Sequence, residues 1–112
     1  MLKVLVVDDE VIVRKGIVLG VDWVKMDCVI VGEAANGIEG LAAAESYKPN
    51  LIITDVRMPR MDGIEMMQEL RRRGCRAHAI FLTAYSDFEY VRSALQLGAA
   101  DYLLKPFRDE EL

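Results

Sequence analysis

The sequence has little of what holds small extracellular domains together or builds zinc sites. It has two cysteines and one histidine among 112 residues, and neither Cys28 nor Cys75 belongs to a Cys-x-x-Cys pair. A zinc site, a thioredoxin-like redox site and a disulfide framework therefore have no support. We interpret both cysteines as small buried hydrophobic residues in a reducing compartment.

Long apolar runs are also missing. No run reaches the ~18 residues that span a bilayer, and the N-terminal segment meets Asp8 and Asp9 too early for a signal peptide. Three prolines and eight glycines beside 53% hydrophobic residues exclude a disordered or collagen-like chain. The net charge of −4 argues against binding of polyanions through overall charge. We expect one cytoplasmic domain over residues 1–112, without a membrane segment.

Short apolar runs alternate with longer stretches of helical character. The runs are bounded by polar or turn residues and cover residues 4–7, 28–31, 51–53, 79–82 and 102–104. Continuous apolar runs suit strands covered on both faces, as in a parallel sheet, and each intervening segment is long enough for a crossover helix. The pattern predicts one doubly wound α/β domain with right-handed crossovers.

The expected helices carry signals at their ends. A capping residue is followed three positions later by Glu in three pairs: Asn36 with Glu39, Asp62 with Glu65, and Ser86 with Glu89. Gly74 and Gly98 stand where a left-handed residue would close the third and fourth helices. The first helix, over residues 10–21, is rich in Val and Ile, which favour strands. We predict a helix there because the segment connects two strands of the sheet.

Polar residues follow four of the five runs at the point where each run ends. Asp8 and Asp9 follow the first run, Asp55 the third, Thr83 the fourth and Lys105 the fifth. Because ligands of open α/β sheets bind beyond the carboxyl ends of the strands, we expect these side chains to meet there. Three crowded carboxylates favour Mg²⁺, and a central carboxylate can act as a nucleophile that gives an acyl phosphate. An ammonium and a hydroxyl could hold two phosphoryl oxygens.

Each of these residues also has an ordinary structural interpretation. Asp9 could cap the first helix, and Asp55 could be a turn residue. Thr83 could simply end its strand, and Lys105 could be a solvated charge. Each alternative is sound for its own residue. Together they do not explain why all five polar residues fall at the carboxyl ends of the predicted strands.

Five motifs, in matching order and spacing, carry a resemblance to a known family. They are Val6-Val7-Asp8-Asp9-Glu10, Thr54-Asp55-Val56-Arg57-Met58-Pro59, Asp62-Gly63, Leu82-Thr83-Ala84 and Leu104-Lys105-Pro106-Phe107. The chain resembles the receiver domain of bacterial two-component response regulators over essentially its whole length. The resemblance implies a flavodoxin-like fold with five parallel strands in the order 2-1-3-4-5. The pattern ends at Leu112 as a fifth helix should begin, so we expect that helix to be largely missing through truncation.

The resemblance implies a phosphorylation site. Asp55 would accept a phosphoryl group from a sensor histidine kinase. Mg²⁺ would be bound by Asp8, Asp9, Asp55 and the main-chain carbonyl of Arg57. The domain would then be a signalling phosphoacceptor rather than an enzyme.

The resemblance also implies a switch. Thr83 would bond one phosphoryl oxygen and Lys105 another, and the Lys105–Pro106 peptide would be cis. Tyr102 matches the aromatic switch position of the family, while an ordinary half-buried strand aromatic is the alternative.

The expected partners lie outside this chain. Residues 21–23 and 84–90 look like those of regulators with an AraC-type helix-turn-helix output domain, so the parent protein would be a transcription regulator. The basic cluster of Arg71, Arg72, Arg73 and Arg76 lies at a helix end, where cations complement the dipole. We therefore expect no direct nucleic-acid binding by this domain. Homodimerisation on phosphorylation stays open.

Two other function classes compete with the switch. A metal-dependent phosphatase with an aspartyl nucleophile, of the haloacid-dehalogenase type, would need acids two residues apart on the first strand, whereas Asp8 and Asp9 are adjacent. A phosphorylation-independent interaction module would not need the acidic set together with Thr83 and Lys105.

Overall fold

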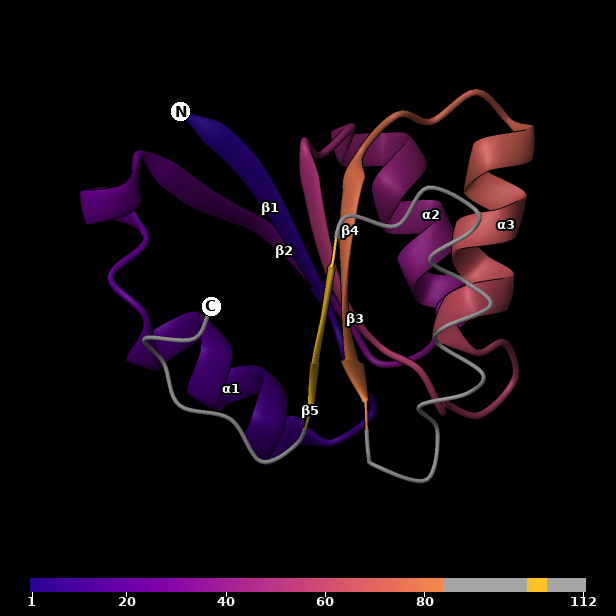
Figure 1. The fold of residues 1–112 in the computed structure, drawn as a ribbon, viewed down its shortest axis with the longest axis horizontal. Coiled ribbons are helices and arrows are strands. Elements are labelled where there is room, and N and C mark those ends of the chain that lie inside the picture. Colours follow the sequence, from indigo (N-terminus) through magenta and orange to yellow (C-terminus); the bar gives the residue numbers. More distant parts are fainter. Residues whose placement is uncertain (84–100, 105–112) are drawn as a thin grey trace.

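The computed structural model places a parallel sheet at the centre of the molecule (Figure 1). It describes residues 1–83 and 101–104, with the side chains of residues 1–82. The strands are β1 (Leu2–Val7), β2 (Cys28–Ala34), β3 (Leu51–Asp55), β4 (His78–Thr83) and β5 (Asp101–Leu104). They form one five-stranded sheet in the order β2-β1-β3-β4-β5, with every neighbouring pair parallel. The predicted flavodoxin-like sheet is confirmed.

Helices cover the sheet on both faces. Helix α1 (Val11–Gly20) lies on one face, while α2 (Gly37–Tyr47) and α3 (Gly63–Arg72) lie on the other (Figure 1). Each follows a strand and leads to a parallel one, as the doubly wound topology requires. The expected fourth helix, with Ser86, Glu89 and Gly98, and the expected fifth helix lie outside the described residues. Among those residues, no helix is long and apolar enough to cross a membrane.

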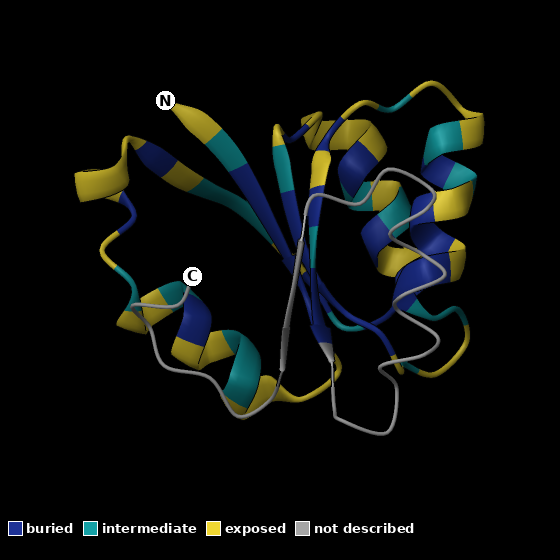
Figure 2. Cartoon of the chain, in the orientation of Figure 1, coloured by how far each residue is buried: buried dark blue, intermediate teal, exposed yellow. Residues whose placement is uncertain are grey.

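Side chains along β1 point alternately to the two faces of the sheet, and this explains why residues 4–7 are all apolar. Leu5 and Val7 belong to the core cluster under α2 and α3, whereas Val4 and Val6 belong to the cluster under α1. All four side chains are fully buried (Figure 2). Because both faces are covered, the strand has apolar residues at each of positions 4–7.

The predicted helix signals have the expected geometry. The side chain of Asn36 accepts a hydrogen bond of 2.9 Å from the backbone N–H of Glu39. Asp62 and Glu65 form a reciprocal capping box at the start of α3. Gly74 follows α3 with φ of 89°, a left-handed conformation that glycine adopts without strain.

In the connection between α1 and β2, the sequence predicts that residues 21–23 close the first helix and pack there, and the structure confirms this for Trp23. A short 3₁₀ helix, η1 (Val24–Met26), follows Trp23, and its C-cap residue Asp27 has φ of 57°. Trp23 is buried and its indole N–H donates to the carbonyl of Ile17 at 3.1 Å. This bond satisfies a carbonyl near the end of α1, so Trp23 closes that helix as well as packing against it.

Candidate functional site

Four acidic side chains meet at the carboxyl end of the sheet. Asp8 follows β1, and Asp55 is the last residue of β3. Since Val7 pairs with Thr54, the two residues that follow leave neighbouring strands together. Carboxylate oxygens of Asp8, Asp9, Glu10 and Asp55 all lie within 4.8 Å of one another. The expected convergence of the three aspartates is therefore present.

The four acids differ in exposure. Asp8 is fully buried and Asp55 is 7% exposed, whereas Asp9 and Glu10 are exposed. The buried pair forms the floor of the cluster and the exposed pair its rim. Carboxylates this close raise one another's free energy when ionised, so the cluster favours an added cation.

Hydrogen bonds fix the turn that carries the first acids. The backbone N–H of Asp8 donates to the carbonyl of Ala34 at 3.0 Å, which extends the pairing of β1 with β2. One carboxylate oxygen of Asp8, Oδ1, accepts from the backbone N–H of Glu10 at 2.9 Å. The N-cap residue of α1 is Glu10, and its side chain makes no capping bond. The capping interpretation of Asp9 is therefore not what the structure has.

The loop after β3 is folded tightly beneath Asp55. Asp55 Oδ1 accepts from the backbone N–H of Val56 at 2.9 Å, and the backbone N–H of Gly63 donates to the carbonyl of Val56 at 2.9 Å. A Cβ on Gly63 would lie 2.0 Å from the carbonyl oxygen of Asp55. Glycine is required there because the start of α3 presses on the backbone of Asp55.

A hollow of about 400 Å³ opens beside the cluster. It is lined by Asp9 and by the β3–α3 loop, in which Arg57 takes part. The predicted coordination by the main-chain carbonyl of Arg57 stays a prediction, although Arg57 and Asp9 line the same hollow.

The donor set fits a hard divalent cation. All four groups are carboxylates, and oxygen ligands are those that Mg²⁺ and Ca²⁺ prefer. The sequence interpretation assigned no metal role to Glu10, although it directly follows Asp8 and Asp9 in the first motif. Its position in that run was the available signal. No rule of residue spacing predicts that the N-cap residue of a helix, here Glu10, contributes a side chain to a metal site.

The remaining predicted residues are placed only in part. Thr83 ends β4 and pairs with Leu104, and Tyr102 lies on β5 opposite Phe81. These registers put the Thr83 backbone at the same edge of the sheet as the acids. Lys105, Pro106 and the peptide between them lie outside the described residues.

Two members of the basic cluster at the end of α3, Arg72 and Arg73, are engaged with acids. Arg72 and Arg73 both form ion pairs with Glu69, and Arg73 also pairs with Glu45 of α2. Hydrogen bonds from Arg72 and Arg73 lower the pKa of Glu69 to about 2. Arg71 and Arg72 lie in the last turn of α3, where the sequence interpretation places cations that complement the dipole, and Arg73 links α3 to α2.

Comparison with known proteins gives a consistent result. A family model for the response regulator receiver domain matches residues 4–112. The transcriptional regulatory protein HptR of Staphylococcus aureus is 36% identical over 112 residues, which are all of this chain and 44% of that protein. The chain thus spans less than half the length of this curated relative.

Solved structures show the same similarity. The receiver domain of AraT, a response regulator from Geobacillus stearothermophilus, has 37% identity and a TM-score of 0.92, covering 98% of this chain and 85% of that one. A two component transcriptional regulator AraC from Clostridium phytofermentans has 36% identity and a TM-score of 0.90, covering 99% and 86%.

Proposed function

The chain belongs to the family of response regulator receiver domains, and on this premise we propose that Asp55 takes a phosphoryl group from a sensor histidine kinase. Receiver domains are signalling switches of two-component systems rather than true enzymes, and the relatives of this chain include transcriptional regulators. The observation that carries the proposal is the convergence of Asp8, Asp9 and Asp55 at one edge of the sheet.

Asp55 suits the role of phosphoacceptor by its position. It ends β3 in the centre of the sheet and is nearly buried, with one carboxylate oxygen held by the Val56 N–H. The other oxygen would attack phosphorus as the bond to the donor breaks, so the carboxylate becomes an acyl phosphate.

The metal-binding residues would be Asp8, Asp9 and Asp55, with the main-chain carbonyl of Arg57. A bound Mg²⁺ would neutralise charge on the transferred group and on the acids around it. Glu10 lies within reach of the same cluster and adds a fourth carboxylate. Asp8 would be held for this role by the Glu10 N–H, and Asp9 would meet the ion at the solvent side.

The surface beside the acids suits a protein donor. Val11 and Ile12, in the first turn of α1, are 57% and 88% exposed. Apolar side chains exposed this far on one helix are typical of a contact surface. Because α1 begins directly after the acidic turn, a kinase bound there would bring its phosphohistidine to Asp55.

The response would pass from the phosphoryl group to the rest of the protein. In the proposed switch, Thr83 and Lys105 bond phosphoryl oxygens and Tyr102 changes its position. The output would be a DNA-binding domain in the remainder of a longer parent chain, of AraC type by resemblance. A homodimer that forms on phosphorylation is a further part of this proposal, and the cytoplasm is the compartment in which it would operate.

Phosphorylation by a small acyl-phosphate donor tests the proposal. The protein is incubated with acetyl phosphate and Mg²⁺, and the covalent product is followed by intact mass and by its decay. We expect one phosphoryl group per chain, decaying slowly, and none on Asp55→Asn. Asp22→Asn, a change of the same kind in the loop after α1, should take up phosphoryl as the unmodified protein does.

The alternatives give different results in the same assay. Many turnovers of donor without a stable product would indicate a phosphatase. No labelling would indicate an interaction module. Labelling of Asp55→Asn at another site would remove Asp55 from the mechanism, and circular dichroism of each variant checks that the fold is kept.

A further inference from the structure

The side chain of Arg14 contacts the backbone of the acidic turn. Its guanidinium Nη1 donates to the main-chain carbonyl of Asp8 at 2.7 Å, which is short for an N–H···O bond. Its Nε donates to Oε1 of Glu33 at 3.0 Å. The Arg14 side chain is only 14% exposed. One planar group thus ties α1 to the ends of β1 and β2.

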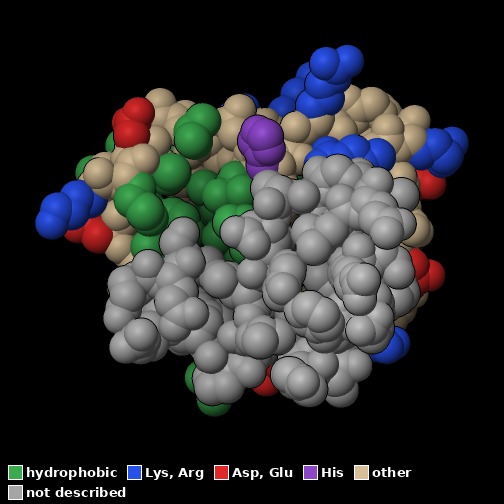
Figure 3. Space-filling model, viewed as in Figure 1, with side chains coloured by type: hydrophobic (Ala, Val, Ile, Leu, Met, Phe, Trp, Pro, Cys, Tyr) green, Lys and Arg blue, Asp and Glu red, His purple; other side chains and the backbone are tan. Residues whose placement is uncertain are grey.

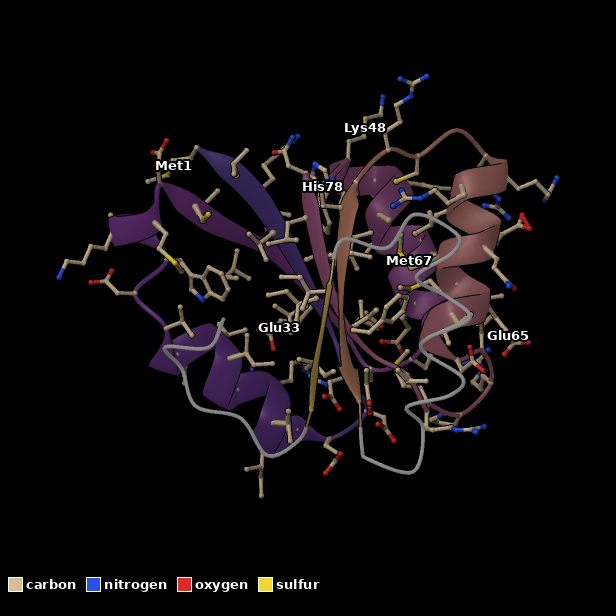
Figure 4. The ribbon with its side chains drawn as sticks, in the orientation of Figure 1. Met1, Glu33, Lys48, Glu65, Met67 and His78 are labelled. Atoms are coloured by element: carbon tan, nitrogen blue, oxygen red, sulfur yellow. The ribbon has the colours of Figure 1, made fainter. Side chains whose placement is uncertain are left out.

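Glu33 holds the far side of this guanidinium. It lies on β2 opposite Val6, on the part of the sheet that faces α1 (Figure 4). Its other oxygen accepts from Lys15 Nζ at 3.0 Å. Burial raises the pKa of Glu33, but hydrogen bonds from Lys15 and Arg14 outweigh this and leave the pKa lowered. Glu33 is therefore an ionised anchor for Arg14 near neutral pH.

The carbonyl of Asp8 is a sensitive point for metal binding. It belongs to the peptide plane between Asp8 and Asp9, so its direction sets where both side chains leave the backbone. The Asp8 side chain is held separately, by the Glu10 N–H on Oδ1. With Arg14 on the carbonyl, the turn is fixed at two points before any cation arrives.

We propose that Arg14 is a positioning residue for the divalent cation, acting through the Asp8 carbonyl and anchored by Glu33. This inference rests on the proposed function, because it needs the acidic cluster to bind Mg²⁺. Arg14 is not a ligand. It holds the turn in the geometry in which Asp8 and Asp9 can bind one ion together.

Charge and positioning predict opposite effects. A guanidinium near the acids repels Mg²⁺, so its removal should tighten binding if charge alone counts. If Arg14 positions the turn, its removal should weaken binding, because residues that orient metal ligands typically change affinity by about 10–100-fold. The sign of the change therefore separates the two.

Titration calorimetry with Mg²⁺ at fixed pH and ionic strength measures this. We expect Arg14→Met to weaken Mg²⁺ binding about tenfold. Arg14→Lys keeps the charge but cannot reach both partners as a planar fork, so its binding should also be weak. Lys15→Met is the matched control: it removes the same charge and a contact with Glu33, and binding should change less than about twofold.

A spectroscopic measurement separates positioning from loss of fold. The amide resonance of Asp9, which reports the Asp8–Asp9 peptide plane, should move in metal-free Arg14→Met and stay in place in Lys15→Met. Glu33→Gln releases only the anchor, so it should fold and show a smaller loss of Mg²⁺ affinity. This variant keeps the test decisive if Arg14→Met does not fold.

The outcomes are distinct. Equal or tighter Mg²⁺ binding by Arg14→Met, or full affinity in Arg14→Lys, would overturn the positioning role while leaving the metal site intact. If the unmodified protein itself binds no Mg²⁺, the metal site of the proposed function fails, and the role of Arg14 fails with it.

Discussion

Two adjacent acids in this molecule have different surroundings. Asp8 is fully buried, and its side chain and backbone take part in bonds with Glu10, Ala34 and Arg14. Asp9 is exposed and lies at the rim of the acidic cluster. Neighbouring residues at the end of a strand point in different directions, so adjacent acids can play unlike parts. Substitution of the buried Asp8 would disturb the fold. Substitution of the exposed Asp9 instead tests the effect of removing one negative charge from the cluster.

Asp9→Asn should stabilise the metal-free protein, because it removes one of four mutually repelling carboxylates while the α1 cap is unaffected. It should also reduce the stabilisation by Mg²⁺, which for a ligand at 100 times its dissociation constant is about 2.7 kcal/mol. Thermal unfolding in EDTA and in millimolar Mg²⁺ measures both effects.

Asp22→Asn serves as the control for Asp9→Asn, since it removes a carboxylate outside the cluster. A lower midpoint of Asp9→Asn in EDTA would mean that Asp9 stabilises the turn. An unmoved midpoint of the unmodified protein in Mg²⁺ would argue against a metal site.

Residues that end strands were predictable, and residues that act through main-chain atoms were not. Asp8, Asp9 and Asp55 could be placed together because apolar runs mark strand ends and a parallel sheet aligns them. The bond from Arg14 to a carbonyl has no spacing pattern, since every residue offers a carbonyl. The roles of Thr83, Tyr102 and Lys105 came from resemblance and remain predictions.

The three described α-helices differ in how well their ends could be predicted from the sequence. The ends of α2 and α3 were predictable because Asn36, Asp62 and Glu65 form local bonds. Helix α1 has no such cap and was placed by its position between strands.

Two glycines in the helices differ in what surrounds them. Gly63 is fixed by the backbone of Asp55, whereas a Cβ on Gly16 would meet nothing within 4 Å.

Alanine at the two glycines should act in opposite directions. Gly16→Ala should raise the free energy of unfolding by about 0.5–1 kcal/mol, because alanine restricts the unfolded chain and favours helix. Gly63→Ala should lower it by about 1–3 kcal/mol or more, since its Cβ would collide with the Asp55 carbonyl. Urea unfolding measures both. Equal stability of the two variants would show that α3 can shift away from Asp55 without loss.

In the part of the molecule that the structure describes, each end of the sheet carries its own cluster of charged side chains. The acids meet at the carboxyl ends of the strands, while Lys and Arg side chains gather where α2 and α3 end (Figure 3). At that second end, Glu69 of α3 pairs with Arg72 and Arg73, and Arg73 reaches Glu45 of α2. Stability in acid should therefore depend on the ion pairs of Glu69 at this second end.

Glu69 makes a definite contribution to acid stability. Its pKa is lowered from 4.5 to about 2 by Arg72 and Arg73 in the folded protein. The stability that this gives is present above about pH 4.5 and is lost as the pH falls towards 2. In Glu69→Gln, the free energy of unfolding should therefore fall less steeply over this range than in the unmodified protein. Urea unfolding at a series of pH values tests this, with Asp22→Asn as control, and parallel curves would contradict it.

The interior position of β1 in the sheet has a consequence for synthesis on the ribosome. β1 is made first, yet it lies between β2 and β3 in the sheet. One of its edges therefore waits for the nascent chain to reach Asp55, the last residue of β3. The acidic cluster waits for the same residue, since Asp8 and Asp9 arrive with β1 and Asp55 with β3. Because the chain emerges N-terminus first, the four acids can come together only once β1 pairs with β3, and under the proposed function a cation would be bound no earlier than that.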